Sequence, residues 1–244
     1  MQHEASHDKV RESVLFHGSW HAPSYAFGKN MRRLFLILAL CTVTCAQADE
    51  WWGWSALEFW RNDTSKAWLF LGNRLDADDG AYVQIVSPRF KHALRPWLDG
   101  GIGLSLLSIE NTRTHDRITQ FRPELELNPH FDLTRHLSLE WRNRMEWRWN
   151  ESQTFTTHRL RNRLQFAYTL PSPIGPLTRV FASNEWLTDL HRGQWNENRL
   201  IPLGVTFKLG PRADLDAFYM IFSSRVNAAW QHESVLGTYL RLRF

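Results

Sequence analysis

The chain of 244 residues lacks several features that mark common classes of protein. It holds only two cysteines, Cys41 and Cys45, and both lie within the first 48 residues. From Asp49 onward there is therefore no thiol, which excludes disulfides, thiolate metal sites and a cysteine nucleophile from that part. The same part contains no long Pro/Gly/Ser linker and no low-complexity tract, so we expect a single domain over residues 49–244.

A strong excess of charge of one sign is also missing. The net charge is +4, and residues 1–48 contribute half of it through five basic and three acidic side chains. The basic residues that remain are spread along alternating segments and do not gather into one patch. The sequence therefore predicts no nucleic-acid partner.

Long apolar runs are scarce, and the one sustained run is residues 34–45. It follows Met31-Arg32-Arg33 and precedes Ala46-Gln47-Ala48, which is the order of regions in a secretory signal peptide. At about a dozen residues the run is shorter than the roughly 20 that a spanning helix needs. We predict a signal peptide over residues 31–48, cleaved after Ala48, and interpret residues 1–30 as a mis-annotated leader. A buried helix or strand is the alternative for the apolar run.

Tryptophan is abundant, with 13 in the chain, and several lie in the stretch Leu137–Trp149. Alternate positions of this stretch, which we call one parity, hold Leu137, Leu139, Trp141 and Trp147. The charged residues fall on the other parity. Successive side chains of a strand point to opposite faces, so the pattern predicts a strand with one apolar and one charged face. A soluble sandwich buries the apolar face in its core, whereas a membrane barrel turns that face toward lipid.

Strands recur every 15 to 20 residues without intervening helical patterns, which predicts an all-β domain. The turn signals include Asn128-Pro129, Pro171–Pro176 and Gly210-Pro211. We expect an antiparallel up-and-down transmembrane β-barrel, and bacterial single-chain barrels have an even number of strands. The candidates number eleven, so we expect ten if Trp52–Trp60 lies outside the barrel, or twelve if two strands are merged. The candidate strands are Trp52–Trp60, Ala67–Leu75, Ala81–Lys91, Trp97–Ile109, Ile118–Asn128, Leu137–Trp149, His158–Thr169, Leu177–Leu187, Asn198–Leu209, Asp214–Phe222 and Val235–Phe244.

The segments between these strands fall into two kinds that alternate along the chain. Compact turns at 128–134, 170–177 and 209–213 suit the periplasmic side of such a barrel. Polar links at 110–117, 150–157, 188–197 and 223–234 suit the outside.

The last ten residues end in an aromatic residue at an alternating position. This end of the chain resembles the C-terminal recognition signal of outer-membrane barrels, through Gly237, Leu240, Leu242 and Phe244. That resemblance implies insertion by the barrel-assembly machinery into the outer membrane of a Gram-negative bacterium, where outer-membrane lipid would contact the barrel. An ordinary closing strand is the alternative interpretation.

Several short motifs resemble one bacterial family. They are Phe121-Arg-Pro-Glu124, Glu140-Trp-Arg-Asn-Arg144, Arg159-Leu-Arg-Asn-Arg163, Asn184-Glu185 and Asn196-Glu-Asn-Arg199. Together, over roughly Trp54 to Phe244, they resemble the uncharacterised outer-membrane β-barrel family known as domain of unknown function 2490. The resemblance implies a fold and a location, but no chemistry, because the family has no assigned activity.

Three successive strands carry a lattice of guanidinium and carboxylate groups on their charged parity. Arginine suits such a lattice because its planar fork can pair with two carboxylates. One interpretation is that these pairs fill the lumen, and the other is that they line a narrow channel for small acidic solutes. We expect these side chains to face the lumen: Arg122, Glu124, Glu126, Glu140, Arg142, Arg144, Glu146, Arg148, Arg159, Arg161 and Arg163.

The remaining polar residues form no recognisable catalytic motif. No two His residues share a metal-ligand spacing with nearby carboxylates, so we predict no metal site and no cofactor. An outer-membrane lipid hydrolase stays a third hypothesis, because a catalytic triad is defined by geometry rather than by sequence position. The polar residues that such a site could use are His130, Asp132, His136, Ser138, His158, His191 and His232.

Overall fold

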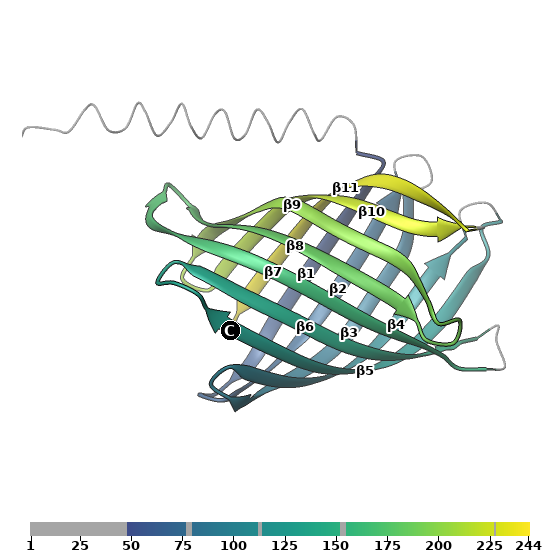
Figure 1. Cartoon of the computed structure of the whole chain (residues 1–244), viewed down its shortest axis with the longest axis horizontal. Coiled ribbons are helices and arrows are strands. Elements are labelled where there is room, and N and C mark those ends of the chain that lie inside the picture. The colour runs from purple at the N-terminus through teal and green to yellow at the C-terminus, as the bar shows by residue number, and fades with distance from the viewer. Residues whose placement is uncertain (1–47, 77–79, 112–113, 152–154, 227) are drawn as a thin grey trace, which may run out of the picture.

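The computed structural model describes residues 48–76, 80–111, 114–151, 155–226 and 228–244. Eleven strands form within these ranges, and they correspond one for one to the eleven candidates (Figure 1). The described residues contain no helix long and apolar enough to cross a membrane. Predictions for residues 1–47, including all but the last residue of the signal peptide, lie outside the described residues. The strands are β1 (Glu50–Arg61), β2 (Ser65–Asp76), β3 (Gly80–Arg95), β4 (Leu98–Glu110), β5 (Arg117–Asp132), β6 (Leu137–Asn150), β7 (Thr157–Ile174), β8 (Leu177–Asp189), β9 (Gln194–Gly210), β10 (Ala213–Val226) and β11 (Ala229–Arg243).

The strands close into one barrel in chain order. Every neighbouring pair is antiparallel except β1 and β11, which run parallel from Glu50 opposite Val235 to Glu58 opposite Arg243. The prediction of ten or twelve strands was therefore wrong, and Trp52–Trp60 belongs to the wall. A ring of purely antiparallel strands must be even in number, so a single parallel pair is what allows eleven.

The parallel pairing of β1 with β11, which we call the parallel seam, is held at its start by Asp49. Its backbone N–H donates to the Ser234 carbonyl at 2.9 Å, and its carboxylate accepts from the Ser234 backbone N–H at 2.7 Å. These hydrogen bonds favour the ionised carboxylate and hold the pKa of Asp49 below its usual value. β1 thus begins at the opposite end of the barrel from the C-terminus.

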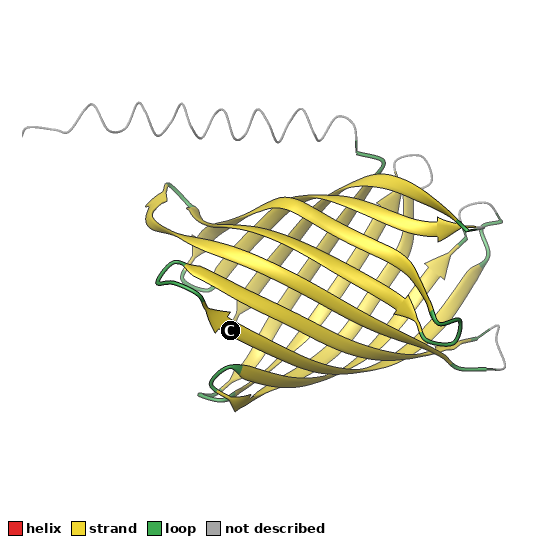
Figure 2. Ribbon diagram, viewed as in Figure 1, coloured by secondary structure: helices red, strands yellow, loops and turns green. Residues whose placement is uncertain are grey.

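The connections fall into two groups, one at each end of the barrel (Figure 2). Short turns at 62–64, 96–97, 133–136, 175–176 and 211–212 lie at the end where β1 and β11 finish, which we call the turn end. The other end carries links that include 190–193 and is called the link end. The predicted alternation of the connections along the chain is confirmed, but the polar link predicted at 223–234 is wrong in its bounds, because β10 continues to Val226 and β11 begins at Ala229.

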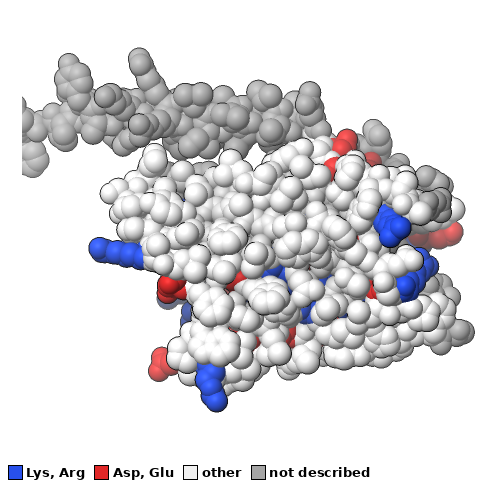
Figure 3. All heavy atoms as spheres, viewed as in Figure 1, with Lys and Arg blue, Asp and Glu red and all other residues white. Residues whose placement is uncertain are grey.

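The barrel has a largely apolar outer face, and most of its charged side chains lie on the inner faces of the strands. On β6, Trp141 and Trp149 are 47% and 43% exposed, whereas Arg144 and Glu146, on the other parity, are buried. Stacked aromatic pairs such as Phe121 with Trp149 lie on the same outer surface. In Figure 3 most atoms of the visible face belong to uncharged residues, and the charged side chains that project from it lie toward its ends. The sequence pattern of β6 is therefore confirmed as an inside–outside division.

One part of the lumen is packed with apolar side chains. Trp52, Phe218 and Met220 form a buried cluster with neighbours from β7, β8 and β11. Glycine makes this packing possible, because the ring of Phe218 occupies the space that a Cβ on Gly237 would need. The ring of Phe181 covers Gly204 in the same way. Aromatic rings lying over glycines on neighbouring strands allow this side of the barrel to pack densely.

Candidate functional site

The charged inner faces of the strands meet in a connected lattice centred on Glu146. This side chain of β6 is fully buried and accepts from Arg159 Nε and Arg161 Nη1, each at 2.8 Å. Arg122 and Arg144 lie farther away, at 3.6 Å and 3.9 Å. Four arginines around one carboxylate give the charge compensation that a buried ion requires.

A second centre of the lattice is Glu185 on β8. Its carboxylate pairs with Arg142 at 2.5 Å, Arg161 at 2.9 Å and Arg199 at 3.7 Å. Arg161 therefore links Glu185 to Glu146. Because one carboxylate serves three guanidinium groups, positive charge is in excess here.

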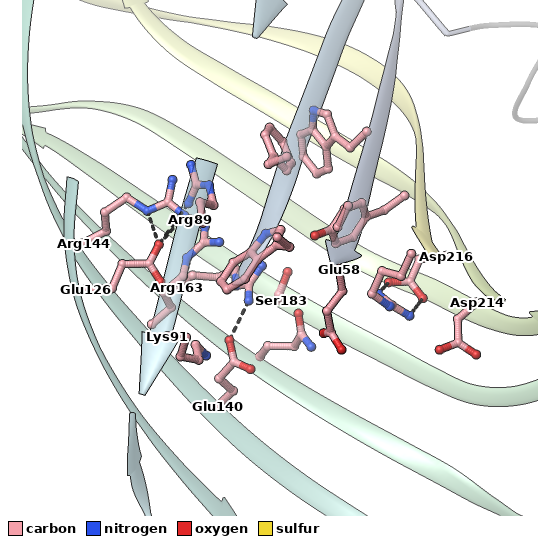
Figure 4. Close-up of a pocket in the computed structure, with 18 of the residues that line it drawn as sticks. Glu58, Arg89, Lys91, Glu126, Glu140, Arg144, Arg163, Ser183, Asp214 and Asp216 are labelled. Atoms are coloured by element: carbon pink, nitrogen blue, oxygen red, sulfur yellow. Dashed lines mark hydrogen bonds and ion pairs between the residues drawn. The ribbon is translucent and has the colours of Figure 1, made fainter. Parts of the chain in front are cut away.

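A third centre lies on β5, where Arg144 pairs with Glu124 and Glu126. The Arg144 Nε donates to Glu126 at 2.6 Å, and Arg89 of β3 reaches both carboxylates, with Nη2 at 2.7 Å from Glu124 (Figure 4). A Cβ on Gly103 would meet a Glu124 oxygen at 3.3 Å. Gly103 and its neighbour Gly101, where a Cβ would meet Glu126 at 3.5 Å, thus leave room for the two glutamate side chains.

All eleven residues predicted to face the lumen lie on inward parities, but they have different surroundings. Seven of them form the continuous lattice around Glu146, Glu185 and the β5 carboxylates: Arg122, Glu124, Glu126, Arg144, Glu146, Arg159 and Arg161. Arg142 extends this lattice through Glu185, and Arg163 pairs with Glu140 at 2.7 Å at its edge. Arg148 bonds to the amide oxygen of Gln120 at 3.3 Å.

Sequence reasoning missed four lattice members, which are Arg89, Glu185, Glu197 and Arg199. They come from strands that it had not included in the charged set. Arg89 precedes the apolar Phe90 and Glu185 precedes the apolar Trp186, whereas Glu197 and Arg199 share one parity of β9, so the available signal was the parity of β3, β8 and β9. Their pairing with β5 to β7 depends on strand order and register, which parity does not give.

Toward the link end the lumen contains fully buried side chains. Inward side chains that are less than 2% exposed include Trp52, Gln120, Glu146 and Leu187. The guanidinium of Arg74 on β2 stacks over the Trp52 ring at 3.8 Å, and that of Arg199 on β9 lies 5.0 Å from the same ring. Cation–π contacts of this kind join the charged lattice to the apolar cluster. Together the two form a layer across the lumen.

On the other side of this layer lies a cavity of about 650 Å³ that reaches the turn end. Glu58, Arg61 and Arg243, near the ends of β1 and β11, line its mouth. Fourteen Lys or Arg side chains line the cavity, against seven Asp or Glu side chains. Its interior is therefore strongly cationic.

Two arginines of the lattice face this cavity more openly than the rest. The side chains of Arg142 and Arg163 are 17% and 25% exposed, compared with 7% for Arg144 and 10% for Arg161. Arg142 and Arg163 lie directly opposite each other on β6 and β7. Like charges at opposite positions repel, so this pair favours an anion between or beside its members.

The cavity wall formed by β1, β2 and β11 is aromatic. Trp54, Phe70 and Tyr239 form a triangle with ring centroids 6.1 to 6.4 Å apart. In the closed order of eleven strands, β1 and its neighbours lie across the barrel from β6 and β7. The cavity therefore has an aromatic wall facing an arginine wall.

Two Ser–His pairs lie on the outer face, where a lipid hydrolase could place its nucleophile. Ser223 Oγ is 2.8 Å from His232 Nδ1, and Ser65 Oγ is 2.7 Å from His92 Nδ1. Each pair joins directly opposite residues of neighbouring strands. Ordinary cross-strand hydrogen bonding accounts for both pairs. No group of three or more His, Cys, Asp or Glu residues in the described ranges is arranged to hold a metal ion.

The residues of the predicted C-terminal signal divide between the two faces of β11. Gly237 lies inward beneath Phe218, whereas Leu240 and Leu242 occupy the other parity. Phe244 is 78% exposed at the turn end. Recognition by the assembly machinery stays a prediction.

Comparison with known proteins gives a family and a distant structural likeness. The anion-selective porin from Comamonas acidovorans aligns with a TM-score of 0.36 and 9% identity, over 71% of this chain and 55% of the porin chain. This chain thus spans about half the length of that porin. No curated protein matches the sequence. The sequence model described as "Protein of unknown function (DUF2490)" matches residues 49–233, which confirms the resemblance carried by the strand motifs. The chain belongs to the DUF2490 family of proteins of unknown function.

Proposed function

We propose that this chain is an outer-membrane β-barrel of a Gram-negative bacterium, exported by the signal peptide at 31–48. Its apolar outer face would contact lipid, and its C-terminal strand would be recognised by the barrel-assembly machinery. The inverted polarity of the barrel supports this proposal, because Trp141 is outside whereas Glu146 is fully buried inside. Short turns are periplasmic in such barrels, so the turn end and its cavity would face the periplasm.

The barrel's role would be that of a closed, non-enzymatic membrane protein that presents a cationic cavity to one side. The observation that carries this proposal is the layer across the lumen, in which Glu146 and Trp52 are both fully buried. A continuous water path would leave inward side chains in this layer exposed to solvent. The lattice therefore acts as a plug, which fits the first interpretation drawn from the sequence.

Planar-bilayer recording of the purified barrel tests this role. We expect no steady conductance, because the lattice and the apolar cluster close the lumen. Steady openings at moderate voltage would overturn the proposal of a closed lumen.

A narrow anion-preferring channel is the second candidate, and the excess of basic over acidic side chains in the cavity favours it. Removing Arg144 and Arg161, which lie deep in the lattice, would be a poor test, since it would take two arginines from Glu146 and one from each of Glu124 and Glu126. Arg142→Gln with Arg163→Gln is better, because Glu185 keeps Arg161 and Arg199.

If the barrel conducts, the channel hypothesis predicts anion-selective openings whose selectivity falls in the double variant Arg142→Gln/Arg163→Gln. The matched control is Arg192→Gln with Arg225→Gln, which removes two exposed charges at the link end. Equal loss of selectivity in both double variants would contradict a selectivity filter at Arg142 and Arg163.

A further inference from the structure

We propose that the cavity at the turn end binds an amphipathic anion, a small molecule with one anionic group on an aromatic or short apolar body. Arg142 and Arg163 would hold the anionic group, and Trp54, Phe70 and Tyr239 would contact the apolar body. The inference rests on the proposed closed lumen in one respect: the ligand would enter and leave through the turn end.

The anion subsite is a pair of under-used guanidinium groups. Arg142 pairs with Glu185 through Nη2 at 2.5 Å, and Arg163 pairs with Glu140 through Nη2 at 2.7 Å. The Nε atom of each side chain is buried without a hydrogen-bond partner. A guanidinium has five N–H donors, so both side chains keep donors for a further oxygen ligand.

The charge balance around this pair favours an anion as that ligand. Glu185 is shared among Arg142, Arg161 and Arg199, and the side chain of Glu140 is 36% exposed. Arg179 of β8 adds a further positive charge to the same cavity, and its Nε is also buried without a partner. A carboxylate, sulfonate or phosphate oxygen would satisfy donors that the lattice leaves open.

The apolar subsite follows from the aromatic wall. The ring of Tyr239 lies 6.1 Å from that of Phe70 and meets that of Trp54 edge-on at 6.3 Å. Trp68 and Ile85 extend this surface along the cavity. A wall of aromatic rings provides no partner for an inorganic anion, but it favours a planar or short aliphatic group.

The shape of the cavity limits the ligand. A volume of about 650 Å³ falls in the range that small-molecule sites occupy, roughly 300–1,000 Å³. The buried layer at Trp52 and Glu146 ends the cavity, so an extended polymer could not pass through it. The two walls together select a compact molecule with both an anionic and an apolar part.

Isothermal titration calorimetry on the barrel in neutral phospholipid nanodiscs tests this inference, with empty nanodiscs as the blank. The probes are 2-naphthoate, which has both parts, 2-naphthalenemethanol, which lacks the charge, and acetate, which lacks the ring. We expect saturable binding of 2-naphthoate at least about tenfold tighter than that of either other probe, because the alcohol loses the charge-assisted hydrogen bonds and acetate loses the buried apolar contact.

Two variants test the two subsites separately. Arg142→Gln with Arg163→Gln should weaken 2-naphthoate by about tenfold or more, whereas Arg192→Gln with Arg225→Gln should leave its affinity unchanged. Phe70→Leu should weaken 2-naphthoate severalfold without changing the affinity for acetate. Heat-dependent mobility on gels shows whether each variant has folded.

Absence of saturable 2-naphthoate binding to the folded barrel would overturn the inference, and so would equal weakening by the two arginine double variants. Equal affinity for acetate and 2-naphthoate would overturn the apolar subsite and leave a simple anion site. Binding is measured independently of conductance. A barrel that conducts yet binds would refute the closed lumen alone, whereas a closed barrel that does not bind would refute this inference alone.

Discussion

At the scale of single residues, the lattice depends on carboxylates that each pair with several arginines. Glu146 is fully buried and contacts Arg122, Arg144, Arg159 and Arg161. Removing one partner from a buried ion pair leaves the other charge uncompensated, which is more harmful than replacing the pair as a whole. The lattice therefore contributes to a unique arrangement of the lumen more than it contributes to net stability.

The variant Glu146→Gln tests this dependence. We expect it to lower the free energy of unfolding by about 3–5 kcal/mol, because the arginines around it lose their shared counter-charge. Urea titration of the refolded barrel, followed by gel mobility, measures the change. Glu110→Gln, which removes an exposed partner of Arg117, is the control and should alter stability little. Equal stability of the two variants would contradict a lattice held together by Glu146.

Gly237 offers a second test, because a glycine there has two candidate roles: packing beneath Phe218 and recognition by the assembly machinery. The ring of Phe218 occupies the space of its missing Cβ, so Gly237→Ala should displace the ring and destabilise the barrel by about 1–3 kcal/mol. Gly210→Ala is the matched control, since a Cβ there would meet nothing within 4 Å. The measurement is unfolding of the purified protein, refolded without any assembly machinery. Unchanged stability would exclude the packing role and leave recognition as the reason for the glycine.

At the scale of elements, the parallel seam between β1 and β11 is the part that sequence reasoning did not predict. Each of the eleven strands could be recognised from alternation and turn residues, and the alternation of the connections was correct, although the link predicted at 223–234 is mostly strand. The even-number rule then led to ten or twelve strands. Alternation does not state which strands pair, and the closing pair depends on contacts such as Asp49 with Ser234, 185 positions apart. The alternation of residue types does not predict contacts of such long range.

Cysteine cross-linking tests the seam directly, since the predicted mature chain has no native thiol. Ser55 lies opposite Leu240 in the register of the two strands, so Ser55→Cys with Leu240→Cys should form a disulfide on oxidation of the folded barrel. Ser55→Cys with Leu236→Cys is the control, because Leu236 lies opposite Trp51. Cross-linking of the control pair but not of the test pair would show that the register is wrong.

At the scale of the whole molecule, the sequence predicted what is inside and what is outside, but not how the inside is divided. The eleven charged residues were expected in the lumen, and they lie on inward faces. Neither the closed layer at Trp52 nor the cavity with its aromatic and arginine walls follows from parity. Both arise because closure brings β1, β2 and β11 across from β6 and β7, and that placement needs strand order, register and side-chain size together.

The central claim is that the apolar outer face of this barrel contacts acyl chains. Its most direct test places a single cysteine with a fluorescent nitrobenzoxadiazole label at Leu125, which is 48% exposed in the middle of β5. In vesicles, we predict blue-shifted emission that lipids with brominated acyl chains quench and aqueous iodide does not. A label at Asp63, in a turn, should show the reverse. Quenching of the Leu125 label by iodide, with no effect of brominated lipid, would contradict the account.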